Sequence, residues 1–96
     1  ITPVNNQVPE KYSLSQNYPN PFNPTTNINF SIPTSGLVKI SIFDISGKEV
    51  VSLVNEVKPA GNYAVDFNAT ALSSGIYFYK INAGNFTQTK KMMLVK

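Results

Sequence analysis

An immunoglobulin-like antiparallel β-sandwich of about seven strands is the fold that the sequence predicts. Polar and apolar residues alternate in at least four short segments, which is the period of a half-buried strand. Turn residues separate these segments at intervals of roughly 8–12 residues, the spacing of a sandwich. No segment has the 3.6-residue periodicity of an amphipathic helix, so we expect an all-β domain.

Six strands are expected in order along the chain, around residues 27–32, 38–42, 49–54, 63–67, 76–81 and 86–95, and a seventh is compatible with the pattern. In the fifth of them, Tyr77, Tyr79 and Ile81 are expected to face the core, and the opposite face is the alternative. We favour the tyrosine face because a tyrosine can bury its ring and still place its hydroxyl at the rim of the sandwich.

Three glycines are expected where the chain passes from one strand to another. Asp44 and Gly47 bracket a hairpin turn, in which the Asp side chain begins the turn and Gly47 adopts a positive φ. Gly61 and Gly75 are expected at the boundaries of later strands. Asp44 is the one carboxylate of its loop, so a calcium site is not expected there.

The composition excludes most catalytic and metal chemistry. The 96-residue chain contains neither cysteine nor histidine, so the commonest metal ligands and the usual general base are missing. Its five carboxylates are scattered along the sequence, and no pair is placed for acid–base catalysis. We therefore expect no enzyme activity, no catalytic residues, no metal and no cofactor.

The charge pattern does not favour nucleic acid or membrane as a partner. The net charge is +3, but every basic residue is lysine, whereas nucleic-acid sites usually use the bidentate arginine fork. No apolar run approaches the roughly 20 residues of a membrane helix. Lysines on strand faces also discourage aggregation at sheet edges, which is the simpler explanation of the basic charge.

Two regions are expected along the chain: a linker to an upstream cargo domain over residues 1–10, and one folded domain over residues 11–96. The first ten residues are polar and contain two prolines, which is typical of a linker. The chain starts without methionine and without a signal-peptide pattern, so we expect it to be part of a longer protein.

Residues 17–24, called here the proline-rich segment, are the most distinctive part of the sequence. Three prolines in six positions fix φ and remove backbone donors, so this stretch is neither helix nor central strand. Two interpretations are open. In the first, Tyr18 and Phe22 can dock on the sandwich as a cap over its end, and at least one of them is expected to be mostly buried. In the second, the segment is a proline-rich ligand for an aromatic groove. The candidate recognition residues here are Tyr18, Pro19, Asn20, Pro21, Phe22, Asn23 and Pro24.

The last expected strand carries two further candidate recognition residues, Lys90 and Lys91. Adjacent residues of a strand point to opposite faces, so at least one of the two lysines must face solvent or a partner. A strand near the end of the domain is well placed to be a sheet edge, which another chain can extend. The alternative is that these lysines only keep the edge soluble.

Together these residues resemble a known family, the type A C-terminal sorting domain of the type IX (Por) secretion system of Bacteroidetes-like bacteria. The likeness spans about residues 12–96. Its most specific part is Leu14-Ser15-Gln16-Asn17-Tyr18-Pro19-Asn20-Pro21-Phe22-Asn23-Pro24-Thr25-Thr26. Weaker matches follow at Ile28-x-Phe30-x-Ile32-Pro33, Val38 to Val50, Ala60-Gly61-x-Tyr63, Leu72 to Tyr79 and Thr89 to Met92. Phe67 and Lys48 stand where relatives often carry tryptophan and arginine.

This resemblance implies a secretion signal rather than an enzyme. Such domains direct an attached cargo protein from the periplasm through an outer-membrane translocon with its shuttle proteins. A sortase-like protease then commonly removes the domain and a surface anchor replaces it, which leaves the cargo secreted or at the cell surface. The alternative function is a structural, adhesive or carbohydrate-binding accessory domain of a secreted protein.

Overall fold

The computed structural model describes residues 2–5 and 8–96, and side chains are described from Val8 onward. This part of the chain forms eight β-strands and no helix. The strands are β1 (Thr2–Asn5), β2 (Ser13–Leu14), β3 (Thr25–Ile32), β4 (Gly36–Phe43), β5 (Glu49–Lys58), β6 (Gly61–Asn68), β7 (Gly75–Ala83) and β8 (Phe86–Leu94).

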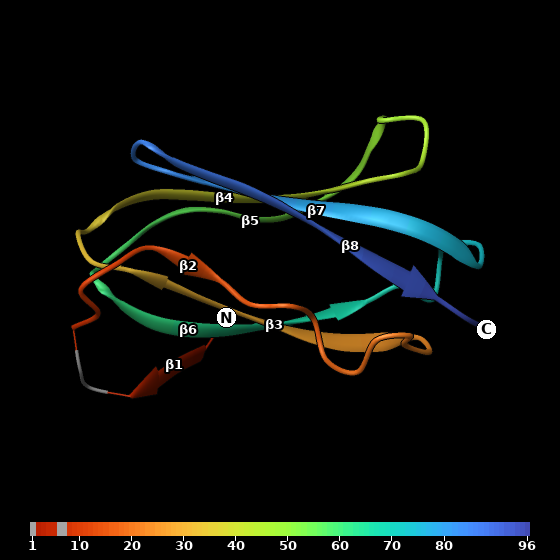
Figure 1. Ribbon diagram of the computed structural model, residues 1–96, viewed down its shortest axis with the longest axis horizontal. Coiled ribbons are helices and arrows are strands. Elements are labelled where there is room, and N and C mark those ends of the chain that lie inside the picture. Colours follow the sequence, from red (N-terminus) through yellow and green to blue (C-terminus); the bar gives the residue numbers. More distant parts are fainter. Residues whose placement is uncertain (1, 6–7) are drawn as a thin grey trace.

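The strands form two four-stranded antiparallel sheets that pack face to face (Figure 1). One sheet has the order β1-β6-β3-β2 and the other has the order β5-β4-β7-β8. Strands β2-β3-β6 and β5-β4-β7-β8 correspond to the A-B-E and C′-C-F-G sheets of immunoglobulin-like sandwiches. The predicted fold class is therefore confirmed, and β8 lies at an edge of the second sheet.

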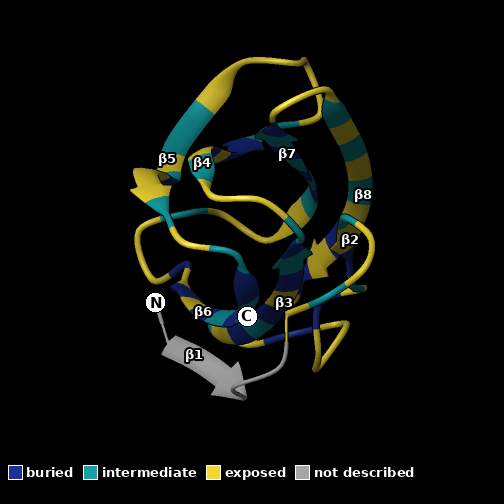
Figure 2. Cartoon of the chain, turned by 90° about the vertical axis from the view of Figure 1, so that its left-hand side faces the viewer, coloured by how far each residue is buried: buried dark blue, intermediate teal, exposed yellow. Residues whose placement is uncertain are grey.

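The core lies between the two sheets, where dark blue buried positions line their inner faces (Figure 2). In β7 the inward positions are Tyr77, Tyr79 and Ile81, which are all buried, so the favoured orientation of this strand is correct. The neighbouring strands supply β-branched and aromatic side chains to the same layer, as half-buried strands do. The largest fully buried side chains include Tyr79, Phe22, Phe30, Ile28, Ile40 and Ile81.

Two short strands were not expected from the sequence. Residues 1–10 were predicted to be a linker, but Thr2–Asn5 form β1, which pairs antiparallel with β6. The two-residue strand β2 pairs with β3 through Ser13 and Leu14. Both strands lie at the edges of their sheet, and with two and four residues they are too short to show the alternating pattern that identifies longer strands.

The turn between β4 and β5 is built around Asp44. Its C=O accepts the N–H of Gly47 at 3.0 Å, and its carboxylate accepts the N–H groups of Ser46 at 2.9 Å and Lys48 at 3.0 Å. Gly47 has a φ of 90°, as this type of hairpin turn requires. The hydroxyl of Ser46 and the N–H of Lys48 lower the pKa of Asp44 by stabilising its charged form. Gly61 begins β6 and Gly75 begins β7.

Candidate functional site

The proline-rich segment crosses the end of the sandwich and contacts both sheets (Figure 1). At its start, Tyr18 exchanges two backbone hydrogen bonds with Asn27 of β3, at 3.0 and 2.9 Å. Further along, Phe22 forms a parallel bridge to Leu94 of β8. The peptide bonds before Pro19, Pro21 and Pro24 are cis. A segment tied to both sheets closes this end of the core.

The two aromatic residues of the segment behave differently. Phe22 is 2 % exposed and packs against Phe67, with ring centroids 6.1 Å apart. It is the docked side chain that the cap interpretation predicts. Tyr18, in contrast, is 81 % exposed, so Phe22 alone docks, which confirms the prediction that at least one of the two is buried. Its backbone is held by Asn27, and this pairing turns the side chain away from the core.

A buried polar cluster fixes the start of the segment. Asn17 is 2 % exposed, and its side-chain amide donates to the hydroxyl of Thr26 at 3.1 Å and to the C=O of Pro19 at 3.2 Å. The Thr26 hydroxyl donates in turn to the C=O of Pro19 at 2.9 Å. The side chain of Gln16 donates to the Asn17 carbonyl oxygen at 2.7 Å. A buried network with its partners satisfied specifies one conformation of the backbone.

Tyr79 connects this cluster to the second sheet. Its hydroxyl donates to the C=O of Ser15 at 2.7 Å and accepts the N–H of Asn17 at 2.8 Å. The side chain is fully buried in the core, and burial raises the pKa of Tyr79 to about 12, against the opposing effect of the Asn17 hydrogen bond. Tyr79 therefore positions the residues immediately before the proline-rich segment.

The edge of β8 is covered over its last residues by the same segment. The N–H of Phe22 donates to the C=O of Met93, and the N–H of Val95 donates to the C=O of Phe22, both at 3.0 Å. The Asn20 side chain accepts the N–H of Met93 at 3.0 Å, and Gln16 donates to the C=O of Lys91 at 2.8 Å. The expected free edge is thus partly occupied from within the chain.

The two candidate lysines of β8 lie on different faces of the sheet. Lys91 is exposed on the outer face, next to Met93, which is 41 % exposed. Lys90 is half-buried on the face that also carries the core residues Met92 and Leu94. Lys91 is therefore the better placed of the two to meet a partner.

A small hollow joins the proline-rich segment to the outer face of β8. It has a volume of about 150 Å³ and is lined by Asn20, Pro21, Ile76, Lys91, Met92 and Met93. The lining is mostly apolar, with the lysine as its charged member. We call the exposed parts of the segment together with this hollow the candidate recognition surface. Of the predicted residues, Phe22 supports this surface from the core and Pro24 is half-buried, whereas the exposed members of the surface are Tyr18, Pro19, Asn20, Pro21, Asn23 and Lys91.

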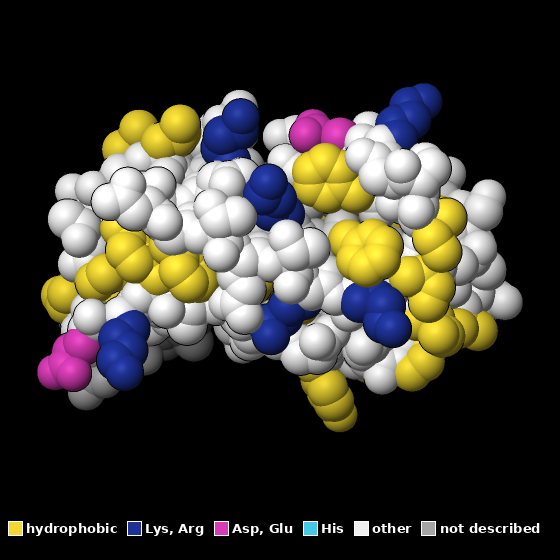
Figure 3. Space-filling model, turned by 45° about the horizontal axis from the view of Figure 1, so that its top comes forward, with side chains coloured by type: hydrophobic (Ala, Val, Ile, Leu, Met, Phe, Trp, Pro, Cys, Tyr) yellow, Lys and Arg dark blue, Asp and Glu magenta, His cyan; other side chains and the backbone are white. Residues whose placement is uncertain are grey.

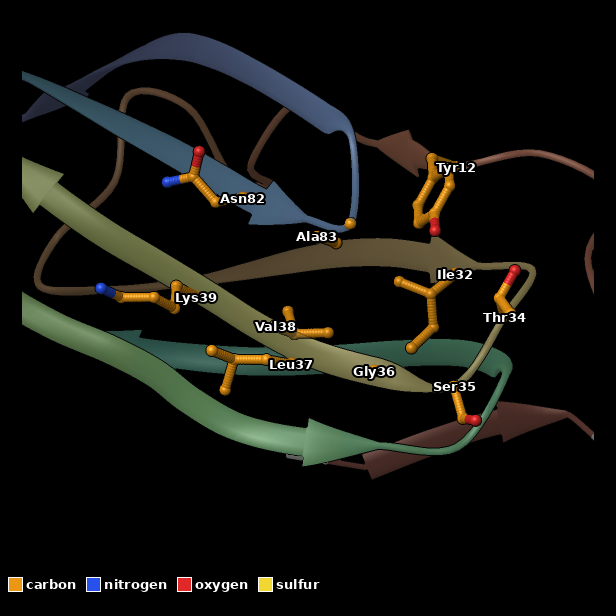
Figure 4. A pocket seen from close by; sticks show the side chains of 11 residues that line it. Tyr12, Ile32, Thr34, Ser35, Gly36, Leu37, Val38, Lys39, Asn82 and Ala83 are labelled. Carbon is orange, nitrogen blue, oxygen red and sulfur yellow. The ribbon is translucent and has the colours of Figure 1, made fainter.

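A second hollow, of about 320 Å³, lies at the opposite end of the sandwich (Figure 4). Tyr12 stands over it, and Ile32, Val38 and Ala83 form its apolar floor. Tyr12 also stacks on Phe86, with ring centroids 5.3 Å apart. The residues predicted for recognition do not line this hollow.

The described residues provide no group of three or more histidine, cysteine or acidic side chains that could hold a metal ion. Within the same part of the chain, no helix is long and apolar enough to cross a membrane. Tyr18 is the one strongly exposed aromatic residue described, so no exposed row of aromatic rings for sugar binding is seen among residues 8–96.

Four residues of the site escaped the sequence reasoning: Gln16, Asn17, Thr26 and Tyr79. Asparagine and threonine are common in surface loops, so the sequence does not mark Asn17 and Thr26 as buried. Only their burial in the structure reveals that they organise the segment. The proximity of Asn17 and Thr26 to three prolines was the available clue, because a stiff loop needs partners for its carbonyl groups. Tyr79 was predicted to be in the core, but not to reach the segment.

Fold and surface together define an immunoglobulin-like sandwich module that displays a docked proline-rich segment beside an edge strand. The family model described as "Secretion system C-terminal sorting domain" matches residues 16–96, and the chain belongs to this family. The match begins at Gln16, the first residue of the polar cluster. A search of curated proteins gave no match.

Membership assigns the chain its general role. It is a type IX secretion C-terminal sorting signal, which acts with the secretion machinery on a linked cargo and serves export across the outer membrane. The family is one of secretion signals and not of enzymes.

Proposed function

We propose that this domain directs an attached cargo protein through the outer-membrane type IX translocon, where translocon and shuttle proteins bind its folded surface. A sortase-like protease then removes the domain and a surface anchor replaces it, so that the cargo is released or held at the cell surface. The family match over residues 16–96 is the observation that carries this proposal.

The candidate recognition surface supports recognition of the folded state. The hydrogen bonds of Tyr18 and Phe22 fix the backbone of the proline-rich segment on both sheets. Because the segment is already ordered, a partner that binds it does not have to supply its ordering entropy. We assign Phe22, Pro19 and Pro24 to holding the segment in place, since the C=O groups of both prolines accept hydrogen bonds. Direct contact is assigned to the exposed residues Tyr18, Asn20, Pro21, Asn23 and Lys91. Lys90, which is half-buried on the inner face of the edge strand β8, is assigned to supporting this strand and not to contact with a partner.

The N-terminal residues support removal by a protease. Val8 is 65 % exposed, and Glu10 is exposed as well, between the strands β1 and β2. Exposed backbone outside regular strands is the usual substrate of proteases. We place the cleavage in the part of the linker that follows β1, where Val8 and Glu10 are exposed.

Export of a fused reporter tests the proposed function. Residues 1–96 are joined to the C-terminus of a periplasmic reporter in a bacterium that has a type IX system. We expect the reporter outside the cell, and we expect it to stay in the periplasm without the domain or in a strain that lacks the translocon. Retention of the complete fusion in the periplasm, with the domain folded, would contradict the proposal.

A further inference from the structure

The outer face of the second sheet has an unusual charge distribution. Strands β4, β7 and β8 contain four lysines and no aspartate or glutamate, and the edge strand β5 adds one carboxylate to this face, Glu49, which lies opposite Phe43. Three of the lysines, Lys39, Lys80 and Lys91, occupy outward positions, since the residues beside them in each strand face the core. Among the described residues, the ion pair found is that of Lys58 with Glu56, so the three outward lysines have no carboxylate partner.

Strand register places these lysines on a diagonal across the sheet. Lys39 is opposite Asn82, Lys80 is opposite Ser41 and Thr89, and Lys91 is opposite Phe78. Each lysine is therefore one strand and two residues away from the next. From the spacing of strands and residues, neighbouring Cα atoms of the diagonal are about 8 Å apart. At this separation like charges raise the local potential, which favours binding of negative groups.

Apolar side chains lie directly beside the diagonal. Phe43 and Phe78 are paired in register and half-buried on this face, with Lys91 at one end of their row and Glu49 of β5 at the other. Met93 and Ile76 form the next row and border the hollow of about 150 Å³. Figure 3 shows this face, with blue lysines between yellow apolar side chains, one magenta acidic group next to a yellow side chain at the upper edge and another at the lower left.

We propose that the Lys39–Lys80–Lys91 diagonal, with Phe43 and Phe78, is a docking face for an acidic protein surface whose apolar side chain enters the hollow beside Lys91. This inference rests on the proposed function and names the chemistry of the partner: a component of the secretion machinery that presents carboxylates around an apolar residue. The face continues directly into the proline-rich segment, because Asn20 and Pro21 line the same hollow.

The shape of the face favours a protein over a lipid surface as the occupant. The hollow has room for one side chain, and Lys91 is its charged lining residue, so it fits an apolar side chain with a carboxylate beside it. The apolar rings of Phe43 and Phe78 are half-buried in the sheet. Membrane-binding surfaces instead insert apolar side chains that project from them. Flat faces with aromatic residues and methionine are typical of protein interfaces.

Two matched double variants of the reporter fusion test this face. Lys39→Gln/Lys91→Gln removes two exposed charges from the diagonal, and Lys11→Gln/Lys48→Gln removes two exposed charges elsewhere. A third variant, Lys39→Arg/Lys91→Arg, keeps the charge. Thermal unfolding of residues 1–96 checks that each variant folds, and flotation with vesicles of phosphatidylethanolamine and phosphatidylglycerol checks for lipid binding.

We expect export of Lys39→Gln/Lys91→Gln to fall about tenfold with unchanged melting temperature, since a loss of about 1.4 kcal/mol of binding corresponds to a factor of ten. The arginine variant and the Lys11→Gln/Lys48→Gln control should be exported like the wild type, and the wild type should not float with vesicles.

Three results overturn the inference: normal export of Lys39→Gln/Lys91→Gln, an equal loss in the control, or vesicle binding that requires Lys39 and Lys91. In each of these cases the proposed function still stands if the unaltered fusion is exported. Failure of the unaltered fusion to leave the cell would overturn both.

Discussion

Phe22 and Leu94 lie side by side in a parallel bridge, although 71 residues separate them in the sequence. This bridge joins the proline-rich segment to the last strand. Two hydrogen bonds of 3.0 Å hold it: the N–H of Phe22 donates to the C=O of Met93, and the N–H of Val95 donates to the C=O of Phe22. The two parts of the chain that the sequence predicts for recognition are therefore one continuous structural unit.

The Phe22 side chain should contribute strongly to stability. It is 2 % exposed and packs against Phe67, so Phe22→Ala leaves a cavity at the end of the core. We expect a loss of about 3–5 kcal/mol in the free energy of unfolding, measured by denaturant titration. Tyr18→Ala is the matched control, because this side chain is 81 % exposed, and it should change stability by less than about 0.5 kcal/mol. Equal stabilities of the two variants would refute docking through Phe22.

The hydroxyl of Tyr79 should matter apart from its ring. Tyr79→Phe keeps the ring and leaves the N–H of Asn17 and the C=O of Ser15 without their partner. We expect a loss of about 1–3 kcal/mol in the free energy of unfolding, the cost of buried groups without hydrogen bonds. Hydrogen exchange should also speed up at the amide of Asn17. An unchanged exchange rate there would mean that Tyr79 does not hold the start of the segment.

Alkaline pH should weaken the fold through the same residue. The pKa of Tyr79 is raised from about 10 in the unfolded chain to about 12 in the folded one. Between these two pKa values the folded state retains a proton that the unfolded state loses. The free energy of unfolding is therefore unaffected by Tyr79 below about pH 10 and declines between about pH 10 and 12. Denaturant titrations at several pH values should show a smaller decline for Tyr79→Phe than for the wild type. An equal decline of the free energy of unfolding with pH in the wild type and in Tyr79→Phe would argue against the raised pKa of Tyr79.

A backbone prediction concerns the hairpin turn after β4. Gly47 has a φ of 90°, and no atom lies within 4 Å of the place that a Cβ would occupy, so Gly47→Ala costs backbone strain without a steric clash. We expect a loss of about 1–2 kcal/mol in the free energy of unfolding. Gly36→Ala is the control, since Gly36 also has open space but no positive φ. A variant Gly47→Ala as stable as the control would show that this turn tolerates another conformation.

The alternation of polar and apolar residues predicted the longer strands well because their inner faces are buried. Strand β5 shows the limit of this reasoning: it was expected to end near residue 54 but extends to Lys58. Its last four residues lie at the sheet edge, where only Lys58 is half-buried, so burial imposes no pattern on them. The four residues of β1 carry a proline and lie in a stretch with the composition of a linker.

The candidate recognition surface was predictable in part. Proline content identified the segment, and the aromatic residue Phe22 was expected to dock. The outward turn of Tyr18 depends on its backbone pairing with Asn27, which no local pattern reveals. The lysine diagonal depends on the register of β4, β7 and β8, so it becomes visible only when the three strands are placed side by side.

Export of the Tyr18→Ala fusion is the most direct test of the claim that the displayed segment is what the secretion machinery recognises. Tyr18 contributes an 81 % exposed ring on a fixed backbone, and such aromatic anchors often dominate binding. Val57→Ala is the control, with a side chain that is 72 % exposed on the distant strand β5. We predict that both variants fold like the wild type, that Val57→Ala is exported normally, and that export of Tyr18→Ala falls about tenfold or more, as expected for losing at least about 1.4 kcal/mol of binding. Normal export of a folded Tyr18→Ala fusion would contradict the claim.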